Sequence, residues 1–317
     1  MNIGFLGTPE ISAHILQELF NKGFNVKWVA TQPDKESGRG RKMSAPAVKD
    51  KARSLGLDVL QSKVFDRVFF EEIQKYGEID LAIVVAYGLY LPTYFLKYPK
   101  NGCINVHFSL LPKYRGAAPV ARAIMNGEKE TGISIMKLVK EMDAGDIIAE
   151  KRLPITVDDT TESLTWTLAK DGAQLLIESM PLYLQGKIIP VLQSSLAIEP
   201  TYAEKIDSKE RFIDWNKEAE TIHNMVRALY PWPVAETKIN GVSIKIIKTK
   251  PIKDVDAEDK DKPVGSVIFI EKKSNCFFVK TSDGALLVEK VQPSGKREMT
   301  VSEFLNGYDL KKGMRFE

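Results

Sequence analysis

The sequence is poor in the residues that cross-link a protein or anchor it in a membrane. Its 317 residues include only two cysteines, Cys103 and Cys276, far apart along the chain. This spacing fits neither a disulfide framework nor a zinc pattern, so no metal is expected. The longest apolar run, Leu81 to Ala86, is far too short to cross a bilayer. No secretory signal precedes the first strand pattern, so a cytoplasmic location is predicted.

Neither positive nor negative charge is in large excess. The net charge is only +3, so the total does not identify a nucleic-acid-binding protein, and any basic surface must come from local clustering. Hydrophobic residues make up 44% of the chain and charged residues 27%, which is typical of a soluble globular protein. The length exceeds what one hydrophobic core usually organises, so two domains are expected. No exposed apolar stripe indicates an oligomer, and a monomer is predicted.

The first half of the chain alternates strand and helix patterns. Apolar segments at 3–6, 26–31, 81–85, 103–107 and 133–136 indicate strands, and residues 11–20 have helical spacing. The segment 81–85 is apolar without alternation, which is typical of a parallel strand covered on both faces. A long helical pattern over 161–184 closes this half. These features predict an α/β domain with a Rossmann-like parallel sheet at residues 1–187.

The second half has a different pattern. Residues 188–205 carry Pro190 and Pro200 with little periodicity, which indicates a linker. After a helix at 218–229, five short strands are expected at 234–238, 242–247, 265–271, 276–281 and 286–291. Short strands without long helices between them favour a small OB-like β-barrel, so residues 206–317 are expected to form a smaller C-terminal domain.

Histidine is rare, and one of the three histidines stands out. His14 and His223 lie within helical patterns, where packing or surface roles are expected. His107 instead lies two residues after Asn105 at the end of a predicted strand, so both side chains point to the same side. Ligands of open parallel sheets bind at the carboxyl ends of the strands, where this pair is expected to lie.

A carboxylate can join this pair. Asp143 and Asp146 flank a glycine turn after the strand at 133–136, and the loop is expected to leave the same sheet edge. An amide, an imidazole and a carboxylate suit acyl transfer to an amine, which must lose a proton while the attacked carbonyl develops an oxyanion. The Gly-x-Ser-x-Gly turn of covalent hydrolases is absent, and so is the Gly-x-Gly-x-x-Gly spacing of dinucleotide sites.

A basic loop follows the second strand. Arg39, Arg41 and Lys42 alternate with glycines, and such a loop can follow a phosphate backbone. Asp34 and Glu36 in the same segment weaken its positive charge. A solvated loop without a partner is the alternative interpretation.

Taken together, these motifs resemble the methionyl-tRNA formyltransferase family over nearly the whole chain. The matching segments are the opening Gly4–Pro9, Ser44–Lys49, Ala86–Pro92, the signature Asn105–Pro119, Met142–Asp146 and Tyr230–Pro233. The run Ser-Leu-Leu-Pro-x-x-Arg-Gly-x-x-Pro in this signature is specific to folate-dependent formyl transfer, whatever the acceptor.

The resemblance implies a reaction and a set of site residues. It implies 10-formyltetrahydrofolate as the formyl donor and initiator Met-tRNA as the acceptor. It also implies Asn105, His107 and Asp143 as the catalytic residues. The resemblance also implies a folate pocket at Tyr87, Gly88, Leu89, Ser109, Leu110, Leu111 and Pro112. The acceptor stem is expected at Arg39, Arg41 and Lys42, with a further basic face at Lys245, Lys248 and Lys250.

Other acceptors and another class of function stay open at this stage. A formyltransferase for a nucleotide-linked amino sugar explains the signature but not the basic loop or the second domain. A single-domain glycinamide ribonucleotide formyltransferase leaves a third of the chain unexplained. A non-catalytic RNA-binding protein leaves Asn105, His107 and Asp143 without a purpose.

Overall fold

The chain divides into two compact units. The structure is a computed structural model that describes residues 1–37, 42–271 and 275–317. Unit 1 contains Met1–Pro119, Glu130–Pro154 and Thr165–Ala203, and unit 2 contains Val120–Lys129, Ile155–Leu164 and Glu204–Glu317. None of the described helices has the length and apolarity that a membrane crossing requires.

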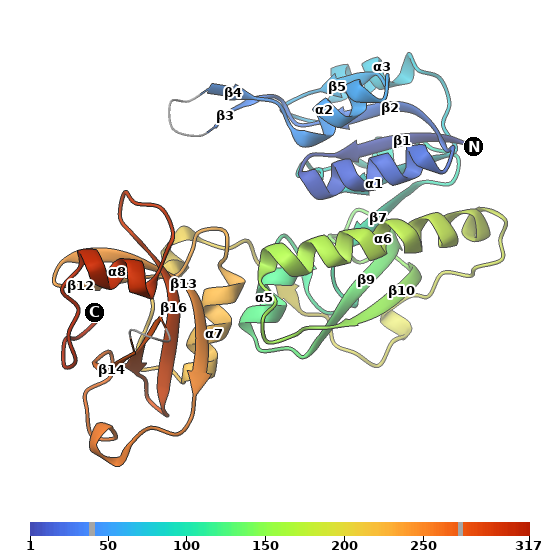
Figure 1. The fold of residues 1–317 in the computed structure, drawn as a ribbon. Helices are drawn as coiled ribbons and strands as arrows, with labels where there is room; N and C mark the ends of the chain where they lie inside the picture. The colour runs from blue at the N-terminus through green and yellow to red at the C-terminus, as the bar shows by residue number, and fades with distance from the viewer. Residues whose placement is uncertain (38–41, 272–274) are drawn as a thin grey trace. The chain divides into compact units, whose positions relative to one another are not determined.

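Unit 1 is built on a seven-stranded sheet in the order β10-β9-β7-β6-β1-β2-β5 (Figure 1). The strands are β1 (Asn2–Gly7), β2 (Asn25–Thr31), β5 (Val59–Gln61), β6 (Leu81–Val85), β7 (Cys103–His107), β9 (Glu130–Lys137) and β10 (Ile147–Pro154). The five strands expected in this half are all present, and β1, β2, β5, β6 and β7 are parallel. The α/β class with a parallel-dominated sheet is therefore confirmed.

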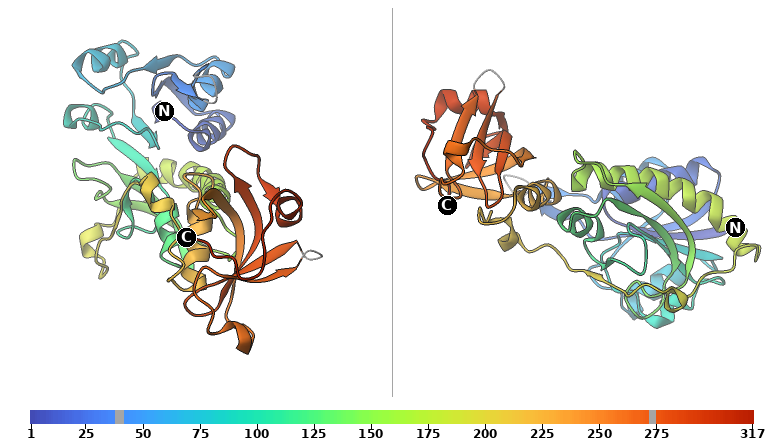
Figure 2. Two further views of the ribbon diagram at one scale, coloured as in Figure 1. Left: turned by 90° about the vertical axis from the view of Figure 1, so that its left-hand side faces the viewer. Right: turned by 90° about the horizontal axis from the view of Figure 1, so that it is seen from below.

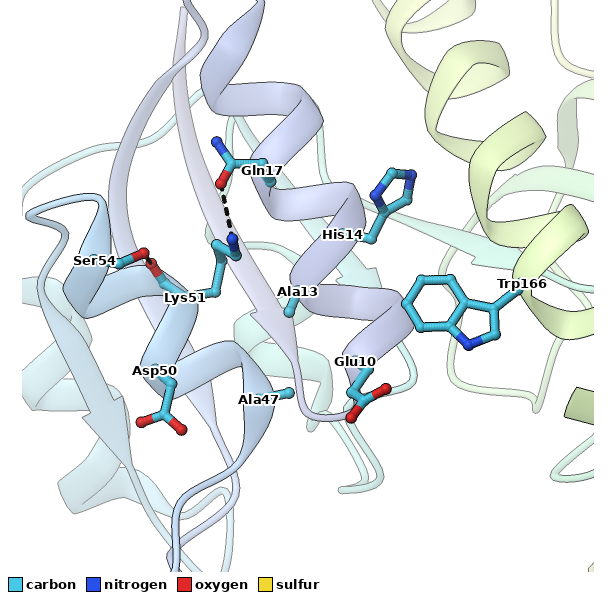
Figure 3. Close-up of a pocket in the computed structure, with 9 residues that line it drawn as sticks. All are labelled: Glu10, Ala13, His14, Gln17, Ala47, Asp50, Lys51, Ser54 and Trp166. Atoms are coloured by element: carbon cyan, nitrogen blue, oxygen red, sulfur yellow. Dashed lines mark hydrogen bonds between the residues drawn. The ribbon is translucent and has the colours of Figure 1, made fainter. Parts of the chain in front are cut away.

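Helices cover both faces of this sheet. They are α1 (Glu10–Asn21), α2 (Ala47–Ser54), α3 (Arg67–Gln74), α4 (Thr93–Leu96) and α6 (Thr161–Leu184). α3 and α4 pack their aromatic side chains against Leu6, Ala82 and Val84 of the strands. α1 and α6 lie side by side, away from this aromatic cluster, and the rings of His14 on α1 and Trp166 on α6 are 6.1 Å apart (Figure 3). Every residue of β6 is buried, as its unbroken apolar pattern predicts.

The direction of β9 differs from the expectation. The sequence pattern predicts a parallel strand at 133–136, but β9 runs antiparallel to β7 and pairs with β10 as a hairpin. Lys137 at the end of β9 therefore pairs with Ile104 near the start of β7. The loop 138–146 leaves from that end of β7 and must fold back along the strand to bring Asp143 to His107.

Unit 2 contains the smaller β-structure. Its strands are β12 (Glu236–Ile239), β13 (Val242–Ile252), β14 (Val267–Glu271), β15 (Cys276–Lys280), β16 (Ala285–Pro293) and β17 (Met299–Thr300). Its helices are α5 (Pro119–Met125), α7 (Ala219–Ala228) and α8 (Val301–Gly307), although Pro119 itself belongs to unit 1. The sheet order is β12-β13-β16-β15-β14, all antiparallel, and β17 pairs with β16. Arg315 bridges Ser266 just before β14, and Phe316 bridges Ile239 in β12, so the chain's last residues join the two ends of the sheet. The predicted OB-like domain is confirmed, and α7 packs beside β13 (Figures 1 and 2).

The segment expected as a linker at 188–205 is largely held by unit 1. Val191 exchanges two backbone hydrogen bonds with Ile147, at 2.8 and 2.9 Å. The short strand β11 (Tyr202–Ala203) pairs in parallel with β8 (Arg115–Gly116), which directly follows the Ser-Leu-Leu-Pro motif.

A buried polar contact joins α7 to β13 within unit 2. The His223 Nε2 atom lies 3.1 Å from the Val157 carbonyl, and Nδ1 lies 3.0 Å from the Thr249 hydroxyl. Because a carbonyl only accepts, Nε2 carries the proton and Nδ1 accepts from Thr249. Burial is the main cause that lowers the pKa of His223 below its usual value, so the folded state favours the neutral ring.

This arrangement predicts an acid-sensitive contribution to stability. Because the pKa of His223 is lowered by folding, the unfolded chain binds more protons than the folded chain below about pH 6.5, the ordinary histidine pKa. The free energy of unfolding should therefore fall as the pH drops through this range. Urea titrations over a pH series give the free energy of unfolding at each pH. Its decrease with falling pH should be shallower in His223→Gln than in the wild type. Equal slopes would contradict this role of His223.

Candidate active site

His107 is the last residue of β7, and its ring is fixed by a backbone carbonyl. The Nε2 atom lies 2.9 Å from the Tyr114 oxygen. Since that carbonyl can only accept, Nε2 must carry a hydrogen, and in the neutral ring Nδ1 carries the lone pair. The residue is only 5% exposed, so its electrostatic interactions are weakly screened by solvent. The loop after β7 therefore selects the tautomer of its own strand-end histidine.

Asp143 faces the other nitrogen of this ring. Its Oδ2 atom lies 3.7 Å from His107 Nδ1, which is longer than a hydrogen bond but close enough for strong charge interaction once the ring is protonated. The same oxygen accepts a 2.8 Å hydrogen bond from the Gly116 amide. The structure thus brings together the imidazole and the carboxylate that were predicted to meet.

Two glycines allow this close arrangement. Gly116 has a φ of +119°, and a Cβ there would lie 2.7 Å from the Ala203 oxygen. A Cβ at Gly145 would lie 1.8 Å from the Lys137 oxygen. A side chain at either position would push apart the loops that carry the Gly116 amide and the Asp143 carboxylate.

Asn105 lies on the same side of β7 as His107, two residues earlier. Its side chain is half-buried, and among the described residues it makes no hydrogen bond. A partly enclosed amide without a protein partner can donate to a substrate oxygen. Asn105 and His107 together form a polar group at the carboxyl end of a central strand.

The first group of predicted folate-binding residues follows β6, the neighbour of β7. The Tyr87 ring is only 2% exposed and packs in the core beside Trp28 and Phe95. Its carbonyl accepts hydrogen bonds from Thr8 and from Gln32 Nε2. Gly88 is exposed and Leu89 is half-buried. A ligand at this strand end would therefore meet Gly88 and Leu89 rather than the Tyr87 ring.

The second predicted folate-binding group is held by one buried serine. The Ser134 hydroxyl lies 2.8 Å from the Ser109 carbonyl and accepts from the Leu111 amide at 3.1 Å. Leu111 and Pro112 are buried, whereas Leu110 is half-buried. Ser134 therefore fixes the backbone of residues 109–111 directly after His107.

The predicted tRNA-binding loop begins and ends in a two-stranded hairpin, β3 (Lys35–Ser37) and β4 (Lys42–Ser44). Lys42 is exposed on β4, whereas Arg39 and Arg41 lie outside the described residues. Both Asp34 carboxylate oxygens lie 2.7 Å from Lys49 Nζ, and this contact is the first cause that lowers the Asp34 pKa. The negative charge of Asp34 is thus neutralised within unit 1.

The lysines expected on the C-terminal basic face are partly paired. Lys248 and Lys250 both form ion pairs with Glu289, at 3.3 and 3.2 Å. Their shared carboxylate reduces the positive potential of this part of β13.

A separate surface pocket of about 550 Å³ lies between α1, α2 and the start of α6 (Figure 3). His14 and Trp166 line one side, and the Lys51 ammonium there already donates to Gln17 at 3.0 Å. It contains none of the predicted catalytic, folate-binding or tRNA-binding residues. His14 packs against Trp166, as its helical position predicts.

Several supporting groups had no clear signal in the sequence. The Tyr114 carbonyl and the Gly116 amide are backbone atoms, so residue identity does not reveal them. Ser134 looks like an ordinary strand residue. Gln193, whose side chain donates to the Asp143 carbonyl, lies in the segment interpreted as a linker.

Comparison with known proteins identifies the family. The formyl transferase family model matches residues 1–180, and the model of the formyl transferase C-terminal domain matches residues 205–309. The chain is 42% identical over 309 residues to a methionyl-tRNA formyltransferase of Halalkalibacterium halodurans, covering 97% of this chain and 95% of the relative. It is 43% identical over 319 residues to that of Dictyoglomus thermophilum, with both chains fully covered.

The fold is also shared with more distant formyltransferases. An N-formyltransferase of Helicobacter canadensis, solved with folinic acid and dTDP-3-aminofucose, has a TM-score of 0.66 and 20% identity over 92% of this chain and 98% of its own. At this identity the similarity supports the fold alone. The two family models and the full-length relatives show that the chain belongs to the methionyl-tRNA formyltransferase family.

Proposed function

We propose that this chain transfers the formyl group of 10-formyltetrahydrofolate to the amino group of methionine carried by initiator tRNA. The observation that carries the proposal is the fixed His107 ring, with Nε2 on the Tyr114 carbonyl and Nδ1 facing Asp143. Family membership supports the acceptor, because the full-length relatives carry that name.

The geometry supports a distinct task for each catalytic candidate. The amine attacks the formyl carbon, and the Asn105 amide donates to the oxygen that becomes negative. The neutral His107 Nδ1 takes the proton that the amine loses, and Asp143 stabilises the resulting imidazolium. When the bond from the formyl carbon to the folate nitrogen breaks, the same Nδ1–H returns the proton to the leaving nitrogen. No covalent enzyme intermediate is required.

Residues 1–187 form the catalytic domain, 188–205 the linker and 206–317 the tRNA-binding domain. Folate binds at the strand ends beside Gly88, Leu89 and residues 109–112, with Tyr87 supporting that loop from the core. The protein acts as a cytoplasmic monomer. The phosphates of the acceptor stem bind the hairpin that carries Arg39, Arg41 and Lys42.

One assay separates this function from its alternatives. The purified chain is mixed with 10-formyltetrahydrofolate and either Met-tRNA or a nucleotide-linked amino sugar. Formyl-Met-tRNA is the expected product. Formylation of the sugar nucleotide alone would replace the proposed acceptor, and tRNA binding without turnover would leave only an RNA-binding protein.

The catalytic assignment predicts a loss of rate without a loss of folding. His107→Ala should lower kcat by about 10²–10⁴-fold, the range of a positioned base. Asn105→Ala should lower it by about 10²–10³-fold, as for other oxyanion donors, and Asp143→Ala should also lower it severely. Asp146→Asn on the same loop is the matched control, because Asp146 pairs with Lys137 instead of His107. If one of the three catalytic variants has the same kcat as Asp146→Asn, the catalytic role proposed for that residue is wrong.

The hairpin assignment predicts a change in salt dependence. Arg41→Ala or Lys42→Ala should weaken tRNA binding and reduce the slope of log affinity against log salt by about 0.7–0.9 for each lost phosphate contact. Lys22→Ala, after the carboxyl end of α1, is the control and should leave the slope unchanged. Binding titrations at several salt concentrations measure this effect. Equal slopes in hairpin variants and control would exclude these residues from the tRNA contact.

A further inference from the structure

The segment between the two family models is fastened to the candidate active site. The models match residues 1–180 and 205–309, and the strap, defined as residues 191–203, lies between them. The whole strap belongs to unit 1. Its start pairs with Ile147 next to the Asp143 loop, and its end pairs with β8 after the His107 loop. The strap therefore touches both loops that define the His107–Asp143 geometry.

Gln193 in the strap is only 4% exposed, and every hydrogen-bonding position of its amide is occupied. Its Nε2 atom donates to the carbonyls of Asp143 and Gly145, both at 2.8 Å. Its Oε1 atom accepts from Arg115 Nε at 3.0 Å and from Nη2 at 2.6 Å. Because the guanidinium only donates and the carbonyls only accept, only one orientation of the amide satisfies all four bonds. Gln193 thus ties the backbone of the Asp143 loop to the residue beside Gly116.

The other end of the strap fixes the partner of His107. The Thr201 hydroxyl accepts a 2.9 Å hydrogen bond from the Tyr114 amide, and the Thr201 carbonyl accepts from the Arg115 amide at 2.9 Å. Tyr114 has a φ of +59°, a conformation that a non-glycine residue keeps only when its surroundings hold it. Its carbonyl is the acceptor for His107 Nε2. Thr201 therefore holds the two peptide units on either side of the Tyr114 α-carbon, the hydroxyl through the Tyr114 amide and the carbonyl through the Arg115 amide, and so fixes the oxygen that accepts from His107.

Asp143 depends on such support because the hydrogen bond within its own turn, from the Ala144 amide to the Glu141 carbonyl, is long at 3.4 Å. It lies in the turn between β9 and β10, outside both strands, with a φ of +49°. The 3.7 Å distance from the Asp143 carboxylate to His107 Nδ1 depends on the position of this turn, because among the described residues only the Gly116 amide donates a hydrogen bond to the carboxylate. A shift of the turn by about 1 Å at a reacting group can cost about 100-fold in rate.

We propose that Gln193 and Thr201 are positioning residues for formyl transfer, and that the strap is a working part of the active site. Gln193 sets the place of the Asp143 carboxylate, and Thr201 sets the Tyr114 carbonyl that orients His107. This inference rests on the proposed function, because it assigns these residues to that same reaction.

The first test compares matched variants of the strap with the wild type. Gln193→Met keeps the length of the side chain and removes all four hydrogen bonds, so kcat should fall by about 10- to 100-fold with little change in the KM of tRNA or folate. Thr201→Val should lower kcat, whereas Thr201→Ser keeps the hydroxyl and should restore it. Ser195→Ala is the control, because its exposed hydroxyl donates to Leu192 within the strap and to no other described residue.

A double-mutant cycle separates positioning from general damage. If Gln193 acts through the Asp143 carboxylate, adding Gln193→Met to Asp143→Asn should change kcat by less than about twofold. A full additional loss in that background would overturn the proposal, because the effect would then be independent of Asp143. The pH profile of kcat should also shift in Gln193→Met, since the charge beside His107 has moved.

The outcomes also distinguish this inference from the proposed function. A wild type that does not formylate Met-tRNA refutes the function itself. A wild type that formylates, together with a Gln193→Met variant of unchanged kcat, refutes only the role of Gln193. If Gln193→Met does not fold, the Thr201→Val and Thr201→Ser pair decides the role of the strap, and equal rates for that pair would reject it.

Discussion

The hydrogen bond between His107 Nε2 and the Tyr114 carbonyl is the contact on which the rest of the site depends. It commits one ring nitrogen to a backbone carbonyl and leaves the other, Nδ1, facing Asp143. The bond exists only because the chain after β7 turns back on itself. Ser134 contacts the first part of that turn at residues 109 and 111, and Thr201 accepts a hydrogen bond from the Tyr114 amide in its second part. The chemistry of one side chain is therefore set by backbone atoms of a loop, and the position of that loop is set by distant segments.

Much of the fold could be predicted from the sequence because its signals are local. The unbroken apolar run of β6 and the strand-end position of His107 both follow from patterns a few residues long. The long helix α6 was predicted with its observed bounds. The meeting of His107 and Asp143 was also predicted, although the path differs. The antiparallel direction of β9 depends on pairing between strands, which no local pattern reveals, so the loop folds back instead of leaving beside His107.

The supporting contacts could not be predicted, for a related reason. Gln193 lies in a stretch with prolines and little periodicity, and local patterns alone indicate a linker there. Its side chain makes four hydrogen bonds to partners 48 to 78 residues earlier in the chain. Asp34 shows the same limit, because its apparent conflict with a basic loop disappears once it pairs with Lys49. The structural role of a polar residue in an irregular segment depends on partners that are distant in the sequence.

The pairing of β11 with β8 has a consequence for how this chain can vary in length. Gln193 is attached to the Asp143 loop by side-chain hydrogen bonds, and Ala203 is paired with Gly116 in the β8–β11 ladder. An inserted or deleted residue between them would displace one anchor or bulge the strap outward. The turn at Gly186 and the neighbouring Ile189, which is 85% exposed, carry no such double attachment. Natural relatives should therefore gain and lose residues around 186–189, while the spacing from 193 to 203 stays constant.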